Sequence, residues 1–404
     1  MTVDTQHKRS VNTPADSGGG LVRPLSSLVW VVCLTAGLWL SLGSAIQATE
    51  ALQKRVSVVA GQVSKLLKSQ SMDAISIGQF SGPPNFPTSS GPGIVQMFND
   101  EFSKHDISVK TRAKVGLAGE YAITEIDQFD SVAGKNVKHL AVKINGRLVD
   151  QFGGVMTSFN TEGIVEGKFE TTVSGAETLV ETIGLPADLP ANATPGEVDN
   201  KLRESLVDPK VTLSNNNTRY RASDDSPYEI EILIDDHPCA IQLEEGLPYV
   251  EIKSGQVYAV KIYNNSPHDS AVRLLIDGLS VFSFSDVRDA QTGKPKYSVY
   301  IVDAKSEATL KGWHKTNDHV ESFLVTGYDN SAAAKLGHTE NLGTITVTFS
   351  AAWPKGSPPP PDEFTSKSAG GNATGFGPPV EHKVEEVQRD IGRVRASLSI
   401  RYTR

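Results

Sequence analysis

The feature that most constrains this 404-residue chain is an uncharged, largely apolar run from Leu25 to Ile46. A helix needs about 20 consecutive apolar residues to cross the hydrocarbon core of a bilayer, and this run is long enough. A cleaved signal peptide is the alternative, because Arg23 precedes the run and small residues occur at Ala45 and Ala48. The apolar part is longer than in most secretory signals and starts late in the chain, so we predict a retained transmembrane helix at 25–46.

The leader 1–24 is short and polar, and most of the chain follows the apolar run. We therefore expect the leader to be cytoplasmic and residues 47–404 to lie outside the cytoplasm, in the periplasm or at the cell surface. Cys33 lies inside the run, between Val32 and Leu34, without the small preceding residue that lipoprotein processing requires. It is expected to be an apolar side chain in lipid. The membrane is thus the first predicted partner.

Residues 47–72 carry apolar side chains at alternating spacings of four and three. This is the a/d pattern of a coiled coil, and it predicts a helical stalk that associates with other copies of the chain. The alternative is a single amphipathic helix that lies on its own globular domain, because about two heptads do not separate the two arrangements. The predicted self-association residues of this first seam are Leu52, Val56, Val59, Val63 and Leu66.

The end of the chain has a second seam after a proline-rich segment. Four consecutive prolines at 358–361, together with nearby Ser, Gly and Asn, predict a disordered linker over 354–380. Segment 381–404 is predicted to form a helix and a final short strand, and the two seams together predict a homo-oligomer. The apolar residues of the second seam are Val384, Val387, Ile391, Val394 and Leu398.

Between the seams the pattern predicts two domains. The first spans 73–213: a strand at Ala74–Phe80 is followed by apolar residues at helical spacing and by a further strand at His139–Asp150, which indicates a small α/β domain. Its trailing helix begins with a capping box formed by Thr194 and Glu197.

The second domain spans 226–353 and reads almost entirely as short strands, such as Tyr228–Ile234 and Val257–Tyr263. Seven or eight such strands predict an antiparallel β-sandwich. The complete fold class is α+β: an N-terminal transmembrane helix and short helical stalk, a small α/β domain, an antiparallel β-sandwich domain, a Pro/Gly-rich linker, and a C-terminal helix plus strand.

Charge and cysteine content limit the partners. The net charge is −8 and no run of Lys or Arg occurs outside the stalk 47–72, so nucleic acid is not an expected partner. Cys239 is the only cysteine beyond the apolar run, so the exported part is expected to hold together by core packing and not by an intrachain disulfide.

The densest set of metal-ligand types is Asp235, Asp236, His237 and Cys239, with His268 about 30 residues further on. Zinc accepts these side chains, but the paired ligand spacing of zinc sites is missing. Asp-Asp-His-Pro is typical of a tight polar turn, so we predict no bound metal, no cofactor and no catalytic set. A second polar loop, from Trp313 to His319, is predicted either to be a recognition surface or to pack Trp313 into the sandwich.

Several blocks resemble uncharacterised membrane-anchored exported proteins of planctomycete bacteria. They include GQFSGPPNFPTSSGPGI, SPYEIEIL, YAVKIYNNSPHDSAVRLLIDGLSVFSFS, KGWHKTNDHVESFLVTGY, LGTITVTFSAAW and VQRDIGRVRASLSIRYTR. The strand, loop, Gly-Pro-Gly and helix order of the first domain is also similar to the α/β domain of curli-secretion-type envelope lipoproteins, although this chain has no lipobox. Neither resemblance assigns a functional residue.

Two functions follow as expectations. The first is a non-enzymatic, single-pass membrane-anchored protein of the cell envelope that acts as a structural, assembly or binding module, with an envelope protein as a possible partner. The alternative is an exported metal-assisted hydrolase that uses the loop Asp235–Cys239 and His268. The predicted anchor and the seams favour the first function.

Overall fold

The computed structural model describes residues 47–83, 88, 90–130, 134–327, 331–332, 343–363, 371–376 and 384–402. These residues belong to one compact unit, and the predicted α+β class is confirmed, with strands predominating over helices. The predicted leader 1–24 and transmembrane helix 25–46 lie outside the described residues. Within the described part of the chain, no helix is long and apolar enough to cross a bilayer.

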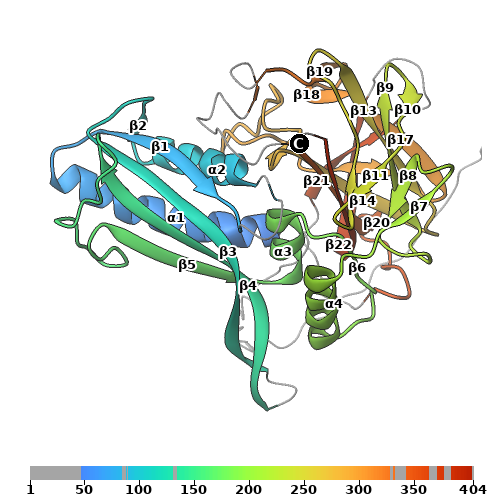
Figure 1. The fold of residues 1–404 in the computed structure, drawn as a ribbon, viewed down its shortest axis with the longest axis horizontal. Coiled ribbons are helices and arrows are strands. Elements are labelled where there is room, and N and C mark those ends of the chain that lie inside the picture. The colour runs from blue at the N-terminus through green and yellow to red at the C-terminus, as the bar shows by residue number, and fades with distance from the viewer. Residues whose placement is uncertain are drawn as a thin grey trace, which may run out of the picture. The chain divides into compact units, whose positions relative to one another are not determined.

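A first lobe is built on a five-stranded sheet with the strand order β2-β1-β3-β4-β5. Strand β1 runs parallel to β2 and β3, while β3, β4 and β5 are antiparallel neighbours. Helices α1 and α2 lie along this sheet (Figure 1). The strands are β1 Ala74–Ser81, β2 Ser108–Val109, β3 Val115–Asp130, β4 Lys135–Asp150 and β5 Lys168–Ser174, and the helices are α1 Gln47–Ser69, α2 Gly91–Lys104, α3 Ala176–Ile183 and α4 Pro195–Val207.

The predicted helices of this lobe are confirmed. Helix α4 begins at the predicted capping box, in which Thr194 and Glu197 each bond the other's backbone N–H. In α2, Ile94, Phe98 and Phe102 all point into the core, as their spacing of four predicts.

Helix α1 is also present, but its apolar seam faces inward. Leu52, Val56, Val59, Val63 and Leu66 are all buried in the core of the first lobe, together with residues of α2, α3 and the sheet. The prediction that these side chains hold copies of the chain together is therefore corrected, and the amphipathic-helix alternative describes α1. Spacings of three and four do not distinguish a helix that packs on its own sheet from a helix that packs on another helix.

We predict that Val56→Asp unfolds the first lobe, while Val58→Asp is tolerated. Val56 is 0% exposed in the core and Val58 is 57% exposed on the same helix. An uncompensated carboxylate at Val56 lowers the free energy of unfolding by more than about 4 kcal/mol, whereas a surface substitution changes it by no more than about 0.5 kcal/mol. Urea unfolding of the two variants, followed by circular dichroism, measures this difference. Equal stability of the two variants, with loss of an oligomer only in Val56→Asp, would restore the self-association prediction.

A second lobe contains two further sheets. The first has the path β18-β19-β13-β9-β8-β7, with β10 and β17 paired to β9 and β13. The second has the path β11-β12-β22-β20-β14-β16-β21, with β6 and β15 paired to β22 and β14. The strands of the first are β7 Thr212–Ser214, β8 Arg219–Arg221, β9 Tyr228–Ile234, β10 His237–Pro238, β13 Val257–Asn264, β17 Ser306–Leu310, β18 Gly312–Thr316 and β19 His319–Leu324. Those of the second are β6 Ala187–Asp188, β11 Gln242–Glu244, β12 Leu247–Tyr249, β14 Asp269–Ile276, β15 Leu279–Ser280, β16 Tyr300–Val302, β20 Thr344–Pro354, β21 Gly371–Phe376 and β22 Val384–Arg401.

The two sheets enclose one hydrophobic core, as a sandwich requires. Alternate residues of β9 and β13 in one sheet, such as Ile230 and Val260, share this core with Leu274 of β14 and Val347 of β20 in the other. The sandwich is larger than the predicted range 226–353, because β7, β8 and β22 also belong to its sheets.

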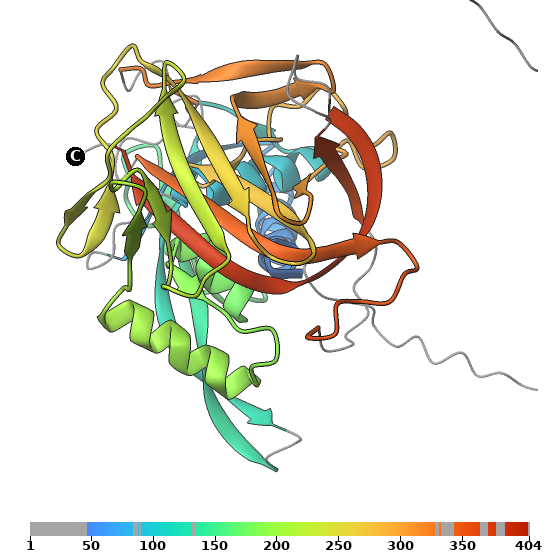
Figure 2. The ribbon, with the colours of Figure 1, turned by 90° about the vertical axis from the view of Figure 1, so that its right-hand side faces the viewer.

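The C-terminal segment corrects the prediction of a helix at 381–404. Residues 384–401 form the single strand β22, which pairs with β20 and β21 (Figure 2). The spacing of three between Ile391 and Val394 arises from a β-bulge, since these residues pair with Ala352 and Ser350, which are only two apart. Beyond the bulges, Leu398 and Ile400 follow the ordinary alternation of a strand. Seam residues Val387, Ile391 and Val394 thus contact other parts of the same chain.

Part of the predicted disordered linker 354–380 is ordered. Residues 371–376 form β21, which pairs with β16 and β22. Further upstream, Glu363 is buried against β22. The described part of the proline-rich segment contains turns, closed by bonds from Ser357 N–H to the Pro354 carbonyl and from Glu363 N–H to the Pro360 carbonyl. The neighbouring strands supply partners that the composition does not reveal.

The two lobes meet where two backbones come into contact. Asp277 and Gly278 form the turn of the β14–β15 hairpin, and both have positive φ, 52° and 74°. A Cβ atom added to Gly93, in the first turn of α2, would lie 2.3 Å from the carbonyl oxygen of Gly278. Only glycine at position 93 permits this approach, which fixes α2 against the sandwich.

Candidate functional site

The contact between the lobes borders a cavity of about 250 Å³, which we call the interlobe cleft. One wall comes from α1, α2 and α3 of the first lobe. The other comes from β14, β15 and the loop 282–298 of the second lobe. Gly93 and Gly278 both line the cleft, so the contact that joins the lobes also shapes it.

One face of α2 supplies most of the helical wall. Gly93, Met97 and Asp100 are four and three residues apart and therefore share this face. The side-chain amide of Gln96 donates to Oδ1 of Asp100 at 2.8 Å. Burial raises the pKa of the Asp100 carboxyl above its ordinary value, although Gln96, Lys104, Arg288 and Lys294 act in the opposite direction. Asp100 is thus a desolvated carboxyl whose ionised form gains from a nearby cation.

The opposite wall contains two cations. The Arg288 guanidinium donates to the backbone carbonyls of Gly293 at 3.0 Å and Ser283 at 3.4 Å, so the loop holds it in place. Lys294 lies on the same loop and also lines the cleft. Phe282 and Tyr297 add an apolar part to this wall, with their ring centroids 6.3 Å apart in an edge-on arrangement.

The inner part of the cleft is closed by an ion pair between the lobes. Nε of Arg273, on β14, lies 3.4 Å from Oε1 of Glu181, on α3, and both side chains are at most 10% exposed. Burial and the neighbouring Glu181 raise the pKa of Glu177 to about 8. The uncharged, protonated form of Glu177 is thus favoured beside the Glu181 carboxylate.

The loop from Trp313 to His319 belongs to the hairpin of β18 and β19. Trp313 packs edge-on against Phe284 and Phe323. His314 is fully buried, with Nδ1 3.0 Å from the Ser285 hydroxyl, and burial lowers its pKa. The interpretation in which Trp313 packs into the sandwich is therefore confirmed.

The structure separates the residues that the sequence offered as weak metal candidates. Asp235 lies in the exposed turn between β9 and β10 and His237 begins β10, where its Nδ1 approaches the Asp235 carbonyl at 2.6 Å. Cys239 follows this turn. The polar-turn interpretation is confirmed, because Asp235 and Asp236 both have the positive φ of a tight hairpin turn.

His268 lies at the other end of the same sheet. On β13, Tyr258 pairs with Ile234, beside the turn, whereas Asn264 pairs with Tyr228 and precedes His268. Six residues of strand place the two sites about 20 Å apart. Among the residues that the structure describes, no group of three or more His, Cys, Asp or Glu side chains is arranged to hold a metal ion.

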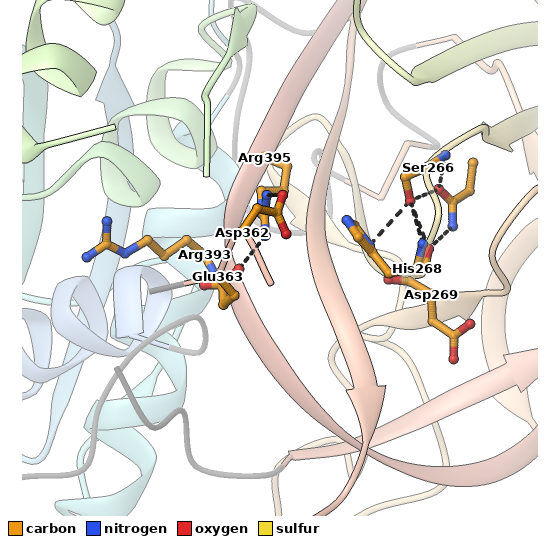
Figure 3. A network of polar contacts seen from close by, with 8 residues as sticks. Ser266, His268, Asp269, Asp362, Glu363, Arg393 and Arg395 are labelled. Carbon is orange, nitrogen blue, oxygen red and sulfur yellow. Dashed lines mark hydrogen bonds and ion pairs between the residues drawn. The ribbon is translucent and has the colours of Figure 1, made fainter. Parts of the chain in front are cut away.

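Two polar clusters lie near the β13–β14 turn and β22 (Figure 3). In the first, the Ser266 hydroxyl lies 3.3 Å from Nδ1 of His268 and also bonds Asn264 and the His268 carbonyl. Ser266 is 1% exposed, so this pair orders the turn and does not form an accessible nucleophile.

The second cluster attaches the end of the proline-rich segment to β22 (Figure 3). Arg395 donates to Oδ2 of Asp362 at 2.7 Å and to Oε2 of Glu363 at 2.6 Å. The Glu363 side chain is 2% exposed and that of Asp362 is 53% exposed. The hydrogen bond from Arg395 lowers the pKa of Asp362 below its ordinary value. The cluster is a structural site that explains why this part of the linker is ordered.

We predict that Asp362→Asn lowers the free energy of unfolding by less than about 1 kcal/mol at pH 7, because the carboxylate is half exposed. The folded-state pKa of Asp362 is lowered, so its contribution is present above the ordinary value of 3.8 and is lost as the pH falls through the folded-state pKa. Urea unfolding of wild type and variant between pH 7 and pH 2 tests this. A difference in the free energy of unfolding between the two proteins that stays constant from pH 7 to pH 2 would contradict the prediction.

Sequence reasoning missed the cleft, because its residues come from segments distant in the chain. Two signals were nevertheless visible. Gly-Pro-Gly at the start of a helix indicates a backbone that approaches another surface, and Asp277-Gly278 between apolar runs is typical of a two-residue hairpin turn. Neither signal indicates that the two segments meet.

A scan against protein-family models and a search of curated proteins found no match to this chain. The assignment of function therefore depends on the geometry of the cleft and on the sequence pattern.

Proposed function

We propose that this chain is a non-enzymatic binding and assembly module of the bacterial cell envelope, held at the membrane by residues 25–46, with the interlobe cleft as its ligand site. The observation that carries the proposal is the cleft itself. It combines apolar side chains with a few charged groups, which is the usual composition of a small-molecule site.

The walls of the cleft are held in place before any ligand binds. The Gly93–Gly278 backbone contact fixes α2, and the Arg273–Glu181 ion pair fixes α3. On the loop, backbone carbonyls hold Arg288. A preformed site of this kind loses little side-chain freedom on binding, which favours affinity for a small ligand.

Membrane anchoring and export are supported by the uncharged run Leu25–Ile46 and by the resemblance to exported planctomycete proteins. Protease treatment of intact spheroplasts tests this placement. Cleavage of residues 47–404 outside the cytoplasm would support it, and protection of that region until the membrane is lysed would contradict it.

The hydrolase alternative needs the Asp235–Cys239 turn and His268 to act on one metal ion. The strand register separates them by about 20 Å, which favours the binding proposal.

We predict that at least one class of small envelope-derived compound binds the full-length protein, and that Ser283→Trp abolishes the binding. Ser283 lines the cleft, so an indole there fills it. Ser103→Trp is the control, because Ser103 is exposed on α2 and is not among the residues that line the cleft. Thermal shift with a panel of amino acids, peptides, sugars and phosphates provides the measurement. Binding that Ser283→Trp leaves unchanged, or no binding by any compound, would contradict the proposal.

A further inference from the structure

Opposite charges line the two walls of the cleft. Asp100 is on α2, and Arg288 and Lys294 are on the loop 282–298. Within the described part of the chain, none of these three side chains takes part in an ion pair. We infer that the cleft binds a small zwitterion of the amino-acid type, with its ammonium group at Asp100 and its carboxylate at Arg288 and Lys294. This inference rests on the proposed function of the cleft.

The Asp100 side of the site is prepared for a cation. Oδ1 of Asp100 accepts the hydrogen bond from Gln96, which orients the carboxylate. The helix also brings Lys104 near, but Lys104 already lies 2.5 Å from Glu101. A ligand ammonium group would therefore give Asp100 a cation at ion-pair distance, in addition to the charges of Lys104, Arg288 and Lys294 that already act on it.

The cationic side is prepared for a carboxylate. Arg288 is held by two backbone carbonyls, which carry no net charge, and within the described part of the chain it forms no ion pair, although its charge acts on Asp100. The acidic residues nearest to Arg288 in the sequence contact other groups. Asp289 accepts hydrogen bonds from the backbone of Gln291 and Thr292, and Asp286 lies 3.9 Å from Lys315. An arginine fixed in this way suits a planar carboxylate.

The rest of the cleft accommodates an apolar side chain. Its apolar lining includes Ile94, Met97, Leu275, Leu279 and Phe282. Its volume of about 250 Å³ is below the range of roughly 300–1,000 Å³ for drug-sized ligands. These features fit an amino acid with an aliphatic side chain.

A phosphate or other simple anion fits less well. Asp100 shares the cleft with the two cations, and its carboxylate repels an added anion that carries no positive charge. A zwitterion places an opposite charge at each wall of the cleft. We therefore expect it to bind more tightly than an anion of the same size.

Isothermal titration of the full-length protein with leucine, as each enantiomer, tests the inference. N-acetylleucine lacks the ammonium group and leucinamide lacks the carboxylate, so each analogue removes one predicted contact. We expect the preferred leucine enantiomer to bind at least about tenfold more tightly than either analogue, because each analogue lacks one charge-assisted contact.

Two variants test separately the ammonium contact at Asp100 and the carboxylate contact at Arg288 and Lys294. Asp100→Asn should remove the preference for leucine over N-acetylleucine and keep the preference over leucinamide. Arg288→Gln combined with Lys294→Gln should have the reverse effect. Asp106→Asn, and Lys311→Gln combined with Lys253→Gln, are the charge-matched controls, because these residues do not line the cleft, and they should retain both preferences.

The outcomes separate this inference from the proposed function. Inorganic phosphate that binds more tightly than leucine, or N-acetylleucine and leucinamide that bind as well as leucine, would overturn the zwitterion assignment. So would the absence of leucine binding. If a sugar or another compound still binds wild type but not Ser283→Trp, the proposed function stands although the ligand class is wrong.

Discussion

The turn at Asp277 and Gly278 holds the second lobe together and joins it to the first. The Asp277 carboxylate accepts hydrogen bonds from the backbone of Gly343 at 2.6 Å and Thr344 at 3.0 Å, and from the Tyr402 hydroxyl at 2.7 Å. Burial raises the pKa of Asp277, and these three bonds offset only part of its desolvation. On its outer side, the Gly278 carbonyl meets Gly93. This single turn thus contacts the start of β20, Tyr402 after β22, and helix α2.

The cleft follows from this arrangement. The backbone contact leaves no room for side chains between α2 and the turn, but on one side of it the helix and the loop 282–298 diverge around a cavity. Polar groups that would be costly inside a lobe lie here, where Arg273 and Glu181 satisfy each other and Asp100, Arg288 and Lys294 line the cleft. The charged groups of the cleft therefore comprise one buried ion pair and three residues that line the cavity without an ion pair among the described residues.

Local patterns in the sequence predicted most elements but not their partners. The capping box at Thr194 and the strand Tyr228–Ile234 could be read directly, because caps and alternation depend on neighbours in the sequence. The seam of α1 was correctly read as helical but assigned to the wrong partner. In β22, the β-bulges near Ile391 place buried residues three apart in the sequence, which is a spacing typical of a helix. The cleft could not be predicted, since it depends on a contact between residues 93 and 278.

The central claim is that this backbone contact joins the two lobes, and one pair of glycine variants tests it directly. Gly93→Ala places a methyl group against the Gly278 carbonyl, whereas Gly196→Ala, at the start of α4 and also after a proline, meets nothing within 4 Å. In urea unfolding, Gly93→Ala should lower the free energy of unfolding by about 1–3 kcal/mol, because the added methyl group overpacks the contact. Gly196→Ala should leave the free energy of unfolding unchanged or raise it by up to about 1 kcal/mol. A Gly93→Ala protein as stable as Gly196→Ala would contradict the account.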